Sequence, residues 1–490
     1  MFKMKAGVAL LVAALYADSA CAMDDSQARL AELESRIKSL TESMGRQIQA
    51  LSGQVQTLQS QLQDAQARQE MANKKNEDLV KASIREVGGF KDGLILEDGG
   101  DWRLQLNGGI QADYRQFSPD EQTTDTFSVR RAHLNTTMFM HKYFSFQIGV
   151  EYANDNAGNK ATTTLTNGYF EFARWPQAKV RVGQFRPLFT LEHVTNDNYI
   201  GYLERSLAYN LSADLTFDRG VMLHGAPIKG VYYSAALTNG TGWNNDNQTS
   251  TDDEKSDGFD TTLRVRANFA ELYDIKDSVI HVGGSYNQGT LAMSGTAKAN
   301  AATTEGRGVK FFSADAFDDD VDRTRWAVET ALARGPVKLM AEYVNLNYDG
   351  RSDNGVSFDH DINAWYASAQ WIVTGENYAD AYSSGVFNRI RPNRDFDGKD
   401  NWGAVELGLR YSRFDASDFK MNGCAIGTGC LSDDYTNKAQ AWTLAANWIF
   451  NPFVRVIANY VRTDFEDDVS VAGKASNYED ALSVRAQINY

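Results

Sequence analysis

The stretch ALSVRAQINY, residues 481–490, alternates apolar and polar side chains up to a final tyrosine. A repeat of two residues indicates a β-strand whose two faces meet different surroundings. A soluble sheet that buries one face would show the same alternation, so this stretch alone leaves the class of protein open. A strand that is apolar at every second position and ends on an aromatic residue is typical of the last strand of an outer-membrane barrel. There it would pair with the first strand and leave no free edge.

The composition excludes helical membrane spans beyond the start of the chain. Of 490 residues, 49 are Lys or Arg and 64 are Asp or Glu, and only seven are proline. The one long apolar run, GVALLVAALY (7–16), follows Lys3 and Lys5 and precedes Ala20-Cys21-Ala22, which predicts a secretory signal peptide over residues 1–22. No other run approaches the roughly 20 apolar residues of a spanning helix. A membrane protein built from the remainder must be a closed barrel.

Removal of the signal peptide leaves two cysteines, Cys424 and Cys430, in MNGCAIGTGC (421–430). Export places them in an oxidising compartment, which predicts a disulfide that closes a short Gly-rich loop. A metal site would need further ligands, and no other His or Cys lies nearby. We therefore expect neither a metal nor a cofactor.

The segment over residues 23–87 predicts an α-helical coiled coil. It contains no aromatic residue and no proline, and its apolar residues recur at spacings of three and four: Leu30, Leu33, Ile37, Leu40, Met44, Ile48, Leu51, Val55, Leu58 and Leu62. A single helix packed on a globular core would show a wider apolar stripe. The number of helices in the coiled coil stays open.

Residues 88–490 consist of short alternating segments separated by Asn-, Asp-, Gly- and Ser-rich clusters. From WRLQLNGGIQADY (102–114) onward we count about sixteen, which predicts an all-β, 16-stranded antiparallel transmembrane β-barrel. Minimal connections such as HKYF (141–144) roughly alternate with long polar ones such as residues 288–322. Such alternation is typical of short periplasmic turns and longer outer loops.

The two faces of these strands differ in chemistry. In TTLRVRANF (261–269), Leu263, Val265 and Ala267 alternate with Arg264 and Arg266 among other polar residues. A dry core would not hold so many charges unless they were paired. The apolar face is therefore expected to meet lipid and the polar face a wet lumen, with a soluble sandwich as the alternative. Aromatic girdles at the two membrane interfaces are expected from Trp102, Tyr114, Tyr143, Phe144, Tyr366, Trp371, Trp448 and Phe450.

Several stretches resemble the phosphate-selective porin O and P family. They are VGQFRPLFTLE (182–192), NYIGYLERSLAYNLS (198–212), WYASAQWIVTGENYADAYSSGVFNRIRP (365–392), WGAVELGLRYS (402–412) and LAANWIFNPFVRVIANYV (444–461). The resemblance covers residues 102–490 and not the coiled coil. It implies a sixteen-stranded barrel, a trimer, and a third long loop that folds into the lumen.

The resemblance also implies a basic constriction. Arg130 and Arg131 stand where the family has a paired arginine, and the expected constriction loop, about residues 186–218, offers Arg186 and Arg205, with Arg219 at its end. Phosphate-selective relatives place a lysine where this sequence has Asn198 beside Asp197. That departure weakens the expectation of strict phosphate selectivity.

Alternation assigns seven cationic side chains to the lumen: Arg103, Arg131, Arg181, Arg264, Arg266, Arg325 and Lys338. Arginine suits anion passage because its planar head donates to oxyanions and stays charged. Arg264 and Arg266 would form a short ladder on one strand. For each of these cations, an ion pair with a glutamate such as Glu151, Glu171, Glu329 or Glu342 is the structural alternative.

Together these features predict an outer-membrane porin for small hydrophilic solutes, with a preference for anions such as phosphate. The alternative is a structural protein whose periplasmic coiled coil tethers the envelope to peptidoglycan or another partner. No catalytic motif appears, so we expect no enzyme, although a hydrolase using His133 is a third possibility. Outer-membrane lipid and lipopolysaccharide are expected partners through acidic outer loops, and the chain is expected to form a homotrimer. No basic patch indicates nucleic acid.

Overall fold

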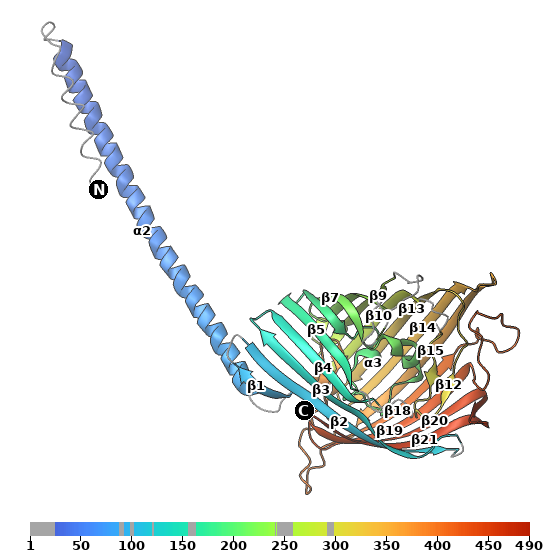
Figure 1. Cartoon of the computed structure of the whole chain (residues 1–490). Helices are drawn as coiled ribbons and strands as arrows, with labels where there is room; N and C mark the ends of the chain where they lie inside the picture. Colours follow the sequence, from blue (N-terminus) through green and yellow to red (C-terminus); the bar gives the residue numbers. More distant parts are fainter. Residues whose placement is uncertain are drawn as a thin grey trace. The chain divides into compact units, whose positions relative to one another are not determined.

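The computed structural model describes residues 25–87, 93–98, 102–119, 122–154, 163–240, 242, 258–291 and 298–490. These residues form two compact units that divide between Arg85 and Glu86. The first unit is one helix, and the second is a β-sheet with short helical turns (Figure 1). The predicted signal peptide lies outside the described residues.

Helix α2 runs from Asp25 to Val87 over 63 residues. Its sequence is rich in strong helix formers and contains no proline, which favours an uninterrupted helix. The members of its apolar stripe whose side chains are described are exposed: Ile37, Leu40, Met44, Val55, Leu58 and Leu62. No helix among the described residues combines the length and the apolar content that a membrane crossing requires.

Sixteen antiparallel strands close into a barrel, as the sequence predicts. Each strand pairs with its neighbour in the chain, and Figure 1 shows the tilted strands surrounding α3. The strands are β2 (Trp102–Ser118), β3 (Thr126–Met140), β4 (Phe144–Asn154), β5 (Thr164–Trp175), β6 (Ala178–Phe185), β7 (Asp218–Ile228), β8 (Val231–Thr238), β9 (Asp260–Asn268), β10 (Ser278–Leu291), β13 (Val321–Arg334), β14 (Val337–Arg351), β15 (Ser357–Ile372), β18 (Ala404–Asp415), β19 (Lys438–Ile449), β20 (Val454–Val471) and β21 (Lys474–Asn489).

The barrel closes where β21 pairs with β2, from Gly109 opposite Asn489 to Ser118 opposite Asp480. Beyond this ladder, Tyr490 and Gly108 exchange two backbone hydrogen bonds of 3.0 and 3.1 Å. Strand β1 (Leu94–Asp98) then pairs with β2 between Arg103 and Leu106. At these residues β3 pairs with the opposite edge of β2. Strand β1 therefore pairs with the same edge of β2 as β21 and begins where the pairing with β21 ends. The seam therefore has its backbone groups paired along most of β2.

The barrel wall inverts the solvation pattern of a soluble protein. On β9, Val265 and Leu263 are 59% and 43% exposed, whereas Arg264 between them is 1% exposed. The largest fully buried side chains include Arg325, Arg410 and Arg485. An apolar exterior around a charged interior fits hydrocarbon outside the barrel.

Aromatic side chains gather in two groups on the outer face. Trp365 and Trp442 each lie within 5.4 Å of the Tyr411 ring, ring centre to centre, on three adjacent strands. At the other strand ends, the Trp448 ring lies 4.4 Å from Phe450 and 5.9 Å from Trp402. The expectation for Tyr366 is wrong: its side chain is 2% exposed and faces inward, because it follows the outward-facing Trp365.

Among the described residues, three connections between strands enter the barrel, whereas the family resemblance implies one. They are residues 186–217 with α3 (Leu191–Val194) and η1 (Leu207–Leu215), residues 298–320 with β11 (Ala302–Thr303) and β12 (Lys310–Phe312), and residues 373–403 with η2 (Tyr378–Ala381), β16 (Tyr382–Ser383) and β17 (Val386–Phe387). A further short helix, α4 (Phe269–Leu272), links β9 to β10. The third inward connection lies at the end of the barrel where most connections are short turns.

Hydrogen bonds and ring packing tie each inward connection to the inner wall. The Tyr202 hydroxyl donates to the Leu409 carbonyl oxygen at 2.9 Å. The Phe312 ring lies 5.3 Å from Phe414, centre to centre, within a buried apolar cluster that fills part of the lumen. The Tyr382 hydroxyl lies 2.6 Å from His281 Nδ1. The lumen is therefore largely packed rather than open.

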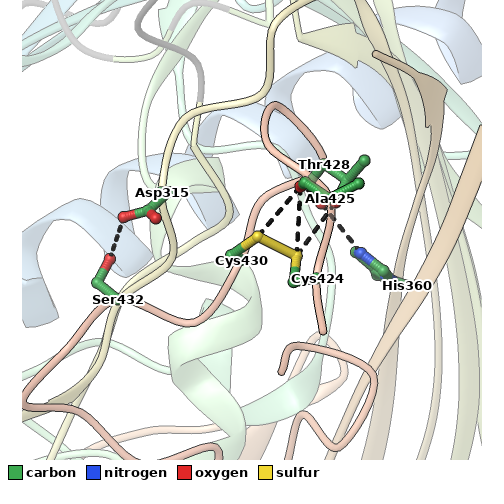
Figure 2. Close-up of a disulfide and its surroundings, with 7 residues drawn as sticks. All are labelled: Asp315, His360, Cys424, Ala425, Thr428, Cys430 and Ser432. Atoms are coloured by element: carbon green, nitrogen blue, oxygen red, sulfur yellow. Dashed lines mark hydrogen bonds between the residues drawn. A yellow bond between two sulfur atoms is a disulfide. The ribbon is translucent and has the colours of Figure 1, made fainter. Parts of the chain in front are cut away.

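The structure has a disulfide between Cys424 and Cys430, in the connection from β18 to β19 (Figure 2). His360 Nε2 lies 3.0 Å from the Thr428 carbonyl oxygen inside this disulfide loop. Ser432 Oγ donates to Asp315 Oδ1 at 2.7 Å. The Asp315 backbone amide also donates to the Cys430 carbonyl oxygen at 2.8 Å, so the disulfide loop is joined to β15 and to the inward connection 298–320.

A charge on the outer face of β9 should destabilise the barrel according to its depth. We expect Val265→Arg, near the middle of the strand, to lower the free energy of unfolding by about 2–4 kcal/mol, and Thr261→Arg, near the strand end, by about 0–1 kcal/mol. Urea unfolding in lipid vesicles measures both. Equal effects at the two positions would contradict a lipid-facing outer surface.

Candidate functional site

The lumen contains a cavity of about 730 Å³ between the inward connection 186–217 and the inner face of β3–β6. Six arginines and four carboxylates line it, together with neutral polar and aromatic side chains. The charged members are Arg130, Arg131, Arg181, Arg186, Arg205, Arg307, Glu151, Asp197, Glu204 and Asp214.

The cavity lies on one side of the barrel because the connection 186–217 is held against the opposite wall. Asn447 Nδ2 donates to the Gly201 carbonyl oxygen at 2.7 Å, and an Arg485 guanidinium nitrogen donates to the Leu203 carbonyl oxygen at 2.7 Å. A Cβ at Gly201 would lie 1.7 Å from Gln370 Nε2, so a larger residue here would displace the Gln370 side chain. The passage is therefore left between the loop and β3–β6.

A β-bulge places two consecutive arginines on the same side of β3. Gln111 of β2 pairs with Arg131 and Ala112 pairs with Val129, which leaves Arg130 as an extra residue. Regular alternation would send one of the two arginines outward into lipid. With the bulge, both guanidinium groups are buried inside the barrel and line the cavity.

Glu204 is the carboxylate around which the arginines gather. Its side chain lies 2.7 Å from Arg115, 2.9 Å from Arg130, 2.9 Å from Arg485 and 3.9 Å from Arg131, between nitrogen and oxygen atoms. Burial raises its pKa, but the positive charges of Arg130 and Arg115 outweigh burial and hold the pKa well below its usual value. Glu204 is thus ionised and anchors the loop to the wall.

Asp197 makes a second link between the loop and the wall. It forms an ion pair with Arg205 of the same loop, and its Oδ2 lies 3.3 Å from Arg131 Nε. Burial raises the pKa of Asp197. The positive charges of Arg131 and Arg205 lower this pKa by a larger amount, so the net shift is downward. Asp197 therefore stays charged and compensates part of the arginine charge.

Three of the cavity arginines lie over aromatic rings, which holds their heads in place. The distances from guanidinium carbon to ring centre are 4.1 Å for Arg181 and Tyr169, 4.9 Å for Arg186 and Phe217, and 4.6 Å for Arg205 and Tyr209. Arg181 also pairs with Glu171 at 2.7 Å. Arg186 donates to the His193 carbonyl oxygen at 2.9 Å, and no described carboxylate lies within ion-pairing distance of it.

The structure separates the predicted site residues into two groups. Arg130, Arg131, Arg181, Arg186 and Arg205 line the cavity. Arg103, Arg264, Arg266, Arg325 and Lys338 lie inside the barrel but outside the cavity lining. The short ladder of Arg264 and Arg266 expected on β9 therefore does not border this open space.

Each residue of the second group has a local partner. Arg264 pairs with Glu329 at 2.6 Å, Arg325 pairs with Asp214, and Arg103 lies over the Phe139 ring. The inward connection 373–403 covers the other two: Arg266 donates to the Ser384 carbonyl oxygen at 3.0 Å, and the Lys338 ammonium lies 4.5 Å from the Phe387 ring centre.

Sequence reasoning missed Arg115, Arg307 and Arg485. Arg115 and Arg485 occupy lumen-facing positions of β2 and β21, so strict alternation could have found them. Arg307 lies between β11 and β12 in a connection expected to be an outer loop. The positive charge of Arg130, together with burial, lowers the pKa of Arg307 to about 9. This depression indicates that cations crowd this part of the cavity.

His133 lines the cavity, and its Nε2 lies 3.2 Å from Asn198 Nδ2. Asn198 Oδ1 also accepts a hydrogen bond from Gln111 at 3.2 Å. Asn198 is thus a neutral amide held against the adjacent strands β2 and β3. Among the described residues, no group of three or more His, Cys, Asp and Glu side chains is placed to hold a metal ion.

The model of one protein family, phosphate-selective porin O and P, matches residues 104–490. The chain belongs to this family. This porin is 24% identical over 396 residues to Porin O of Pseudomonas aeruginosa, covering 74% of this chain and 83% of that protein. As a member of the family, it is an outer-membrane diffusion channel and not an enzyme.

Two solved structures are similar to this porin in fold. OmpT of Vibrio cholerae has a TM-score of 0.47 and 15% identity, covering 81% of this chain and 100% of that chain. The anion-selective porin of Comamonas acidovorans has a TM-score of 0.49 and 11% identity, covering 80% of this chain and 100% of that chain.

Neutralising Glu204 should change both stability and selectivity. We expect Glu204→Gln to leave Arg115, Arg130 and Arg485 incompletely paired, to lower the free energy of unfolding by about 3–5 kcal/mol, and to raise anion selectivity. Because the folded pKa is depressed, this stabilisation is present above the unfolded pKa and is lost as pH falls through the folded value.

Urea unfolding and reversal potentials measure the two effects. Glu151→Gln is the matched control, because Glu151 accepts hydrogen bonds from the backbone amides of Ala132 and Ala153 and forms no ion pair within the described chain. Equal effects of the two substitutions would show that Glu204 does not anchor the arginines.

Proposed function

We propose that this porin passes small anions in preference to cations, and that phosphate is among them. The observation that carries the proposal is the surplus of arginines over carboxylates around the open passage. A positive lining in a water-filled bore raises the local concentration of anions, whatever the net charge of the whole chain. The net charge of −15 therefore does not oppose anion passage.

The pairing of most arginines supports passage rather than tight binding. Arg130, Arg131, Arg181 and Arg205 each share a carboxylate, which lowers the field that a passing anion meets. Conduction needs sites that attract a solute without trapping it. Arg186, which has no such carboxylate among the described residues, is the strongest candidate for direct contact with an anion.

Asn198 argues against strict selectivity for phosphate. It adds hydrogen-bonding capacity but no charge at the position where phosphate-selective relatives have a lysine. We therefore propose that phosphate passes together with other small anions. The proposal does not require the porin to exclude chloride.

Planar-bilayer recordings in a gradient of potassium chloride test the anion preference. We expect a reversal potential of the sign given by chloride, and we expect Arg186→Gln to move it toward zero because one cation is lost from the passage. Arg413→Gln is the control, since Arg413 lies on the outer face of β18 and is 48% exposed. A cation-selective wild type would defeat the proposal.

The proposal includes the domain organisation: a signal peptide over residues 1–22, a periplasmic coiled coil over 23–87 and a porin domain over 88–490. The exposed apolar stripe of α2 supports self-association, because a helix leaves such a stripe in water only at a free-energy cost. We propose that three chains associate and that α2 helices pack together. Attachment of this coiled coil to peptidoglycan or another periplasmic partner is the second candidate role.

Deletion of residues 24–87 separates the two roles of the helix. If α2 only stabilises the trimer, the truncated trimer should dissociate on dilution in detergent at a higher protein concentration than the full-length trimer does, while the single-channel conductance stays unchanged. If α2 is also a tether, cells that carry the truncation should release more outer-membrane vesicles. Sedimentation equilibrium and vesicle counts measure the two outcomes, and an unchanged oligomer would contradict coiled-coil association.

We also propose that the polar outer surface beyond the aromatic residues of β14–β20 contacts lipopolysaccharide. Arg413, Lys438 and Arg462 lie there on three adjacent strands, with carboxylates close to each. Such a mixed surface fits phosphate groups bridged by divalent cations. The phosphates of an outer-leaflet glycolipid would lie at this height.

A further inference from the structure

One wall of the cavity carries neutral hydrogen-bonding groups rather than charges. Asn135 on β3, Gln147 on β4, and Thr166 and Asn167 on β5 all line the open space. Inorganic anions are recognised chiefly by positive charge and by N–H donors. A cluster of side-chain amides and hydroxyls, which can both donate and accept, instead matches a solute that carries hydroxyl groups.

Three of these side chains converge over Gly149. A Cβ placed on Gly149 would lie 2.4 Å from Asn135 Oδ1, 2.7 Å from Thr166 Oγ1 and 3.2 Å from Asn167 Nδ2. The absent side chain of Gly149 makes room for these groups from the two neighbouring strands. We call the cluster of Asn135, Gly149, Thr166 and Asn167 the amide patch.

The polar groups of the amide patch are not used within the described structure. Gln147 Nε2 donates to Thr137 Oγ1 at 3.1 Å, but the side chains of Asn135, Thr166 and Asn167 form no hydrogen bond to another described residue. They are half-buried and border the cavity. Their hydrogen-bonding capacity is therefore available to water or to a solute.

Two cavity arginines, Arg131 and Arg186, lie beyond the amide patch toward the same end of the barrel. Arg131 precedes Asn135 by four residues on β3, which corresponds to about 13 Å along a strand. On β6, Gln184 Nε2 donates to the Thr166 carbonyl oxygen at 3.3 Å, and Arg186 follows Gln184 by two residues. Arg186 therefore leaves the wall beside the amide patch.

The size of the cavity exceeds what a bare oxyanion needs. Sites for organic ligands typically enclose about 300–1,000 Å³, and the cavity of about 730 Å³ falls in this range. A solute that fills it would extend from an arginine to the neutral wall.

We propose that the passage contains a binding subsite for phosphorylated sugars or polyols, with the phosphate against Arg186 and the hydroxyl groups on the amide patch. This inference rests on the proposed anion preference and names the solute class of the same passage. The phosphate supplies attraction to the arginines, and the hydroxyl groups add hydrogen bonds that inorganic phosphate cannot reach. Neither part alone uses both walls of the cavity.

The test measures how strongly three solutes block chloride current through the full-length porin in planar bilayers. The solutes are glucose 6-phosphate, inorganic phosphate and glucose. We expect glucose 6-phosphate to half-block the current at a concentration at least fivefold below that of phosphate, and glucose to have no effect. Equal block by glucose 6-phosphate and phosphate in an anion-selective wild type would overturn the subsite and leave the proposed function standing.

Two variants separate the subsite from the charge. Asn167→Leu has nearly the same volume but no polar group, so it should raise the half-blocking concentration of glucose 6-phosphate to that of phosphate and leave block by phosphate unchanged. Gly149→Ala should act in the same direction by crowding the amide patch. An unaltered preference in both variants would overturn the subsite, whereas a cation-selective wild type would overturn the proposed function itself.

Discussion

The structure depends on one constraint: backbone groups that lie in hydrocarbon must find their hydrogen-bond partners within the chain. Sixteen strands satisfy it only as a closed ring, so the pairing of β21 with β2 completes the barrel. Closure fixes which side of every strand meets lipid. Apolar residues such as Val265 then occupy the outside, and Arg264 and its neighbours are confined to the inside.

Confinement of the charges explains why the lumen is packed with ion pairs. A buried arginine needs a carboxylate nearby, and the connection 186–217 supplies Glu204 and Asp197 to arginines of the wall. The same contacts that position this loop therefore reduce the positive charge of the passage. Arg186, which forms no ion pair among the described residues, retains a positive charge that anions can use.

The passage lies off-centre because apolar and polar packing occupy the rest of the bore. Phe312 and Phe414 belong to a buried cluster beneath one part of the wall, and the connection 373–403 covers Lys338 on another. The cavity lies beside the loop, along the inner face of β3–β6. The bulge at Arg130 and the bare backbone of Gly149 are local irregularities that place charged and neutral groups along the same path.

The sequence by itself determined the β-barrel, the number of strands, the helix before it and the alternation of apolar and polar faces along most strands. These properties depend on how apolar residues recur: every second residue in a strand, and at spacings of three and four in a helix. Such repeats are local and can be recognised in a single sequence. The sequence also identified five of the arginines that line the cavity. Regular alternation alone would have pointed only one of Arg130 and Arg131 inward, because a bulge shifts the register without a clear sequence signal.

Only the tertiary structure decided which inward cations border open space. Arg485 and Asp113 form an ion pair although 372 residues separate them, and Arg266 is covered by a connection that follows β15. Alternation states that a side chain faces the lumen but not what fills the lumen opposite it. That depends on connections whose paths are set by packing inside the closed barrel, and no local pattern encodes those contacts.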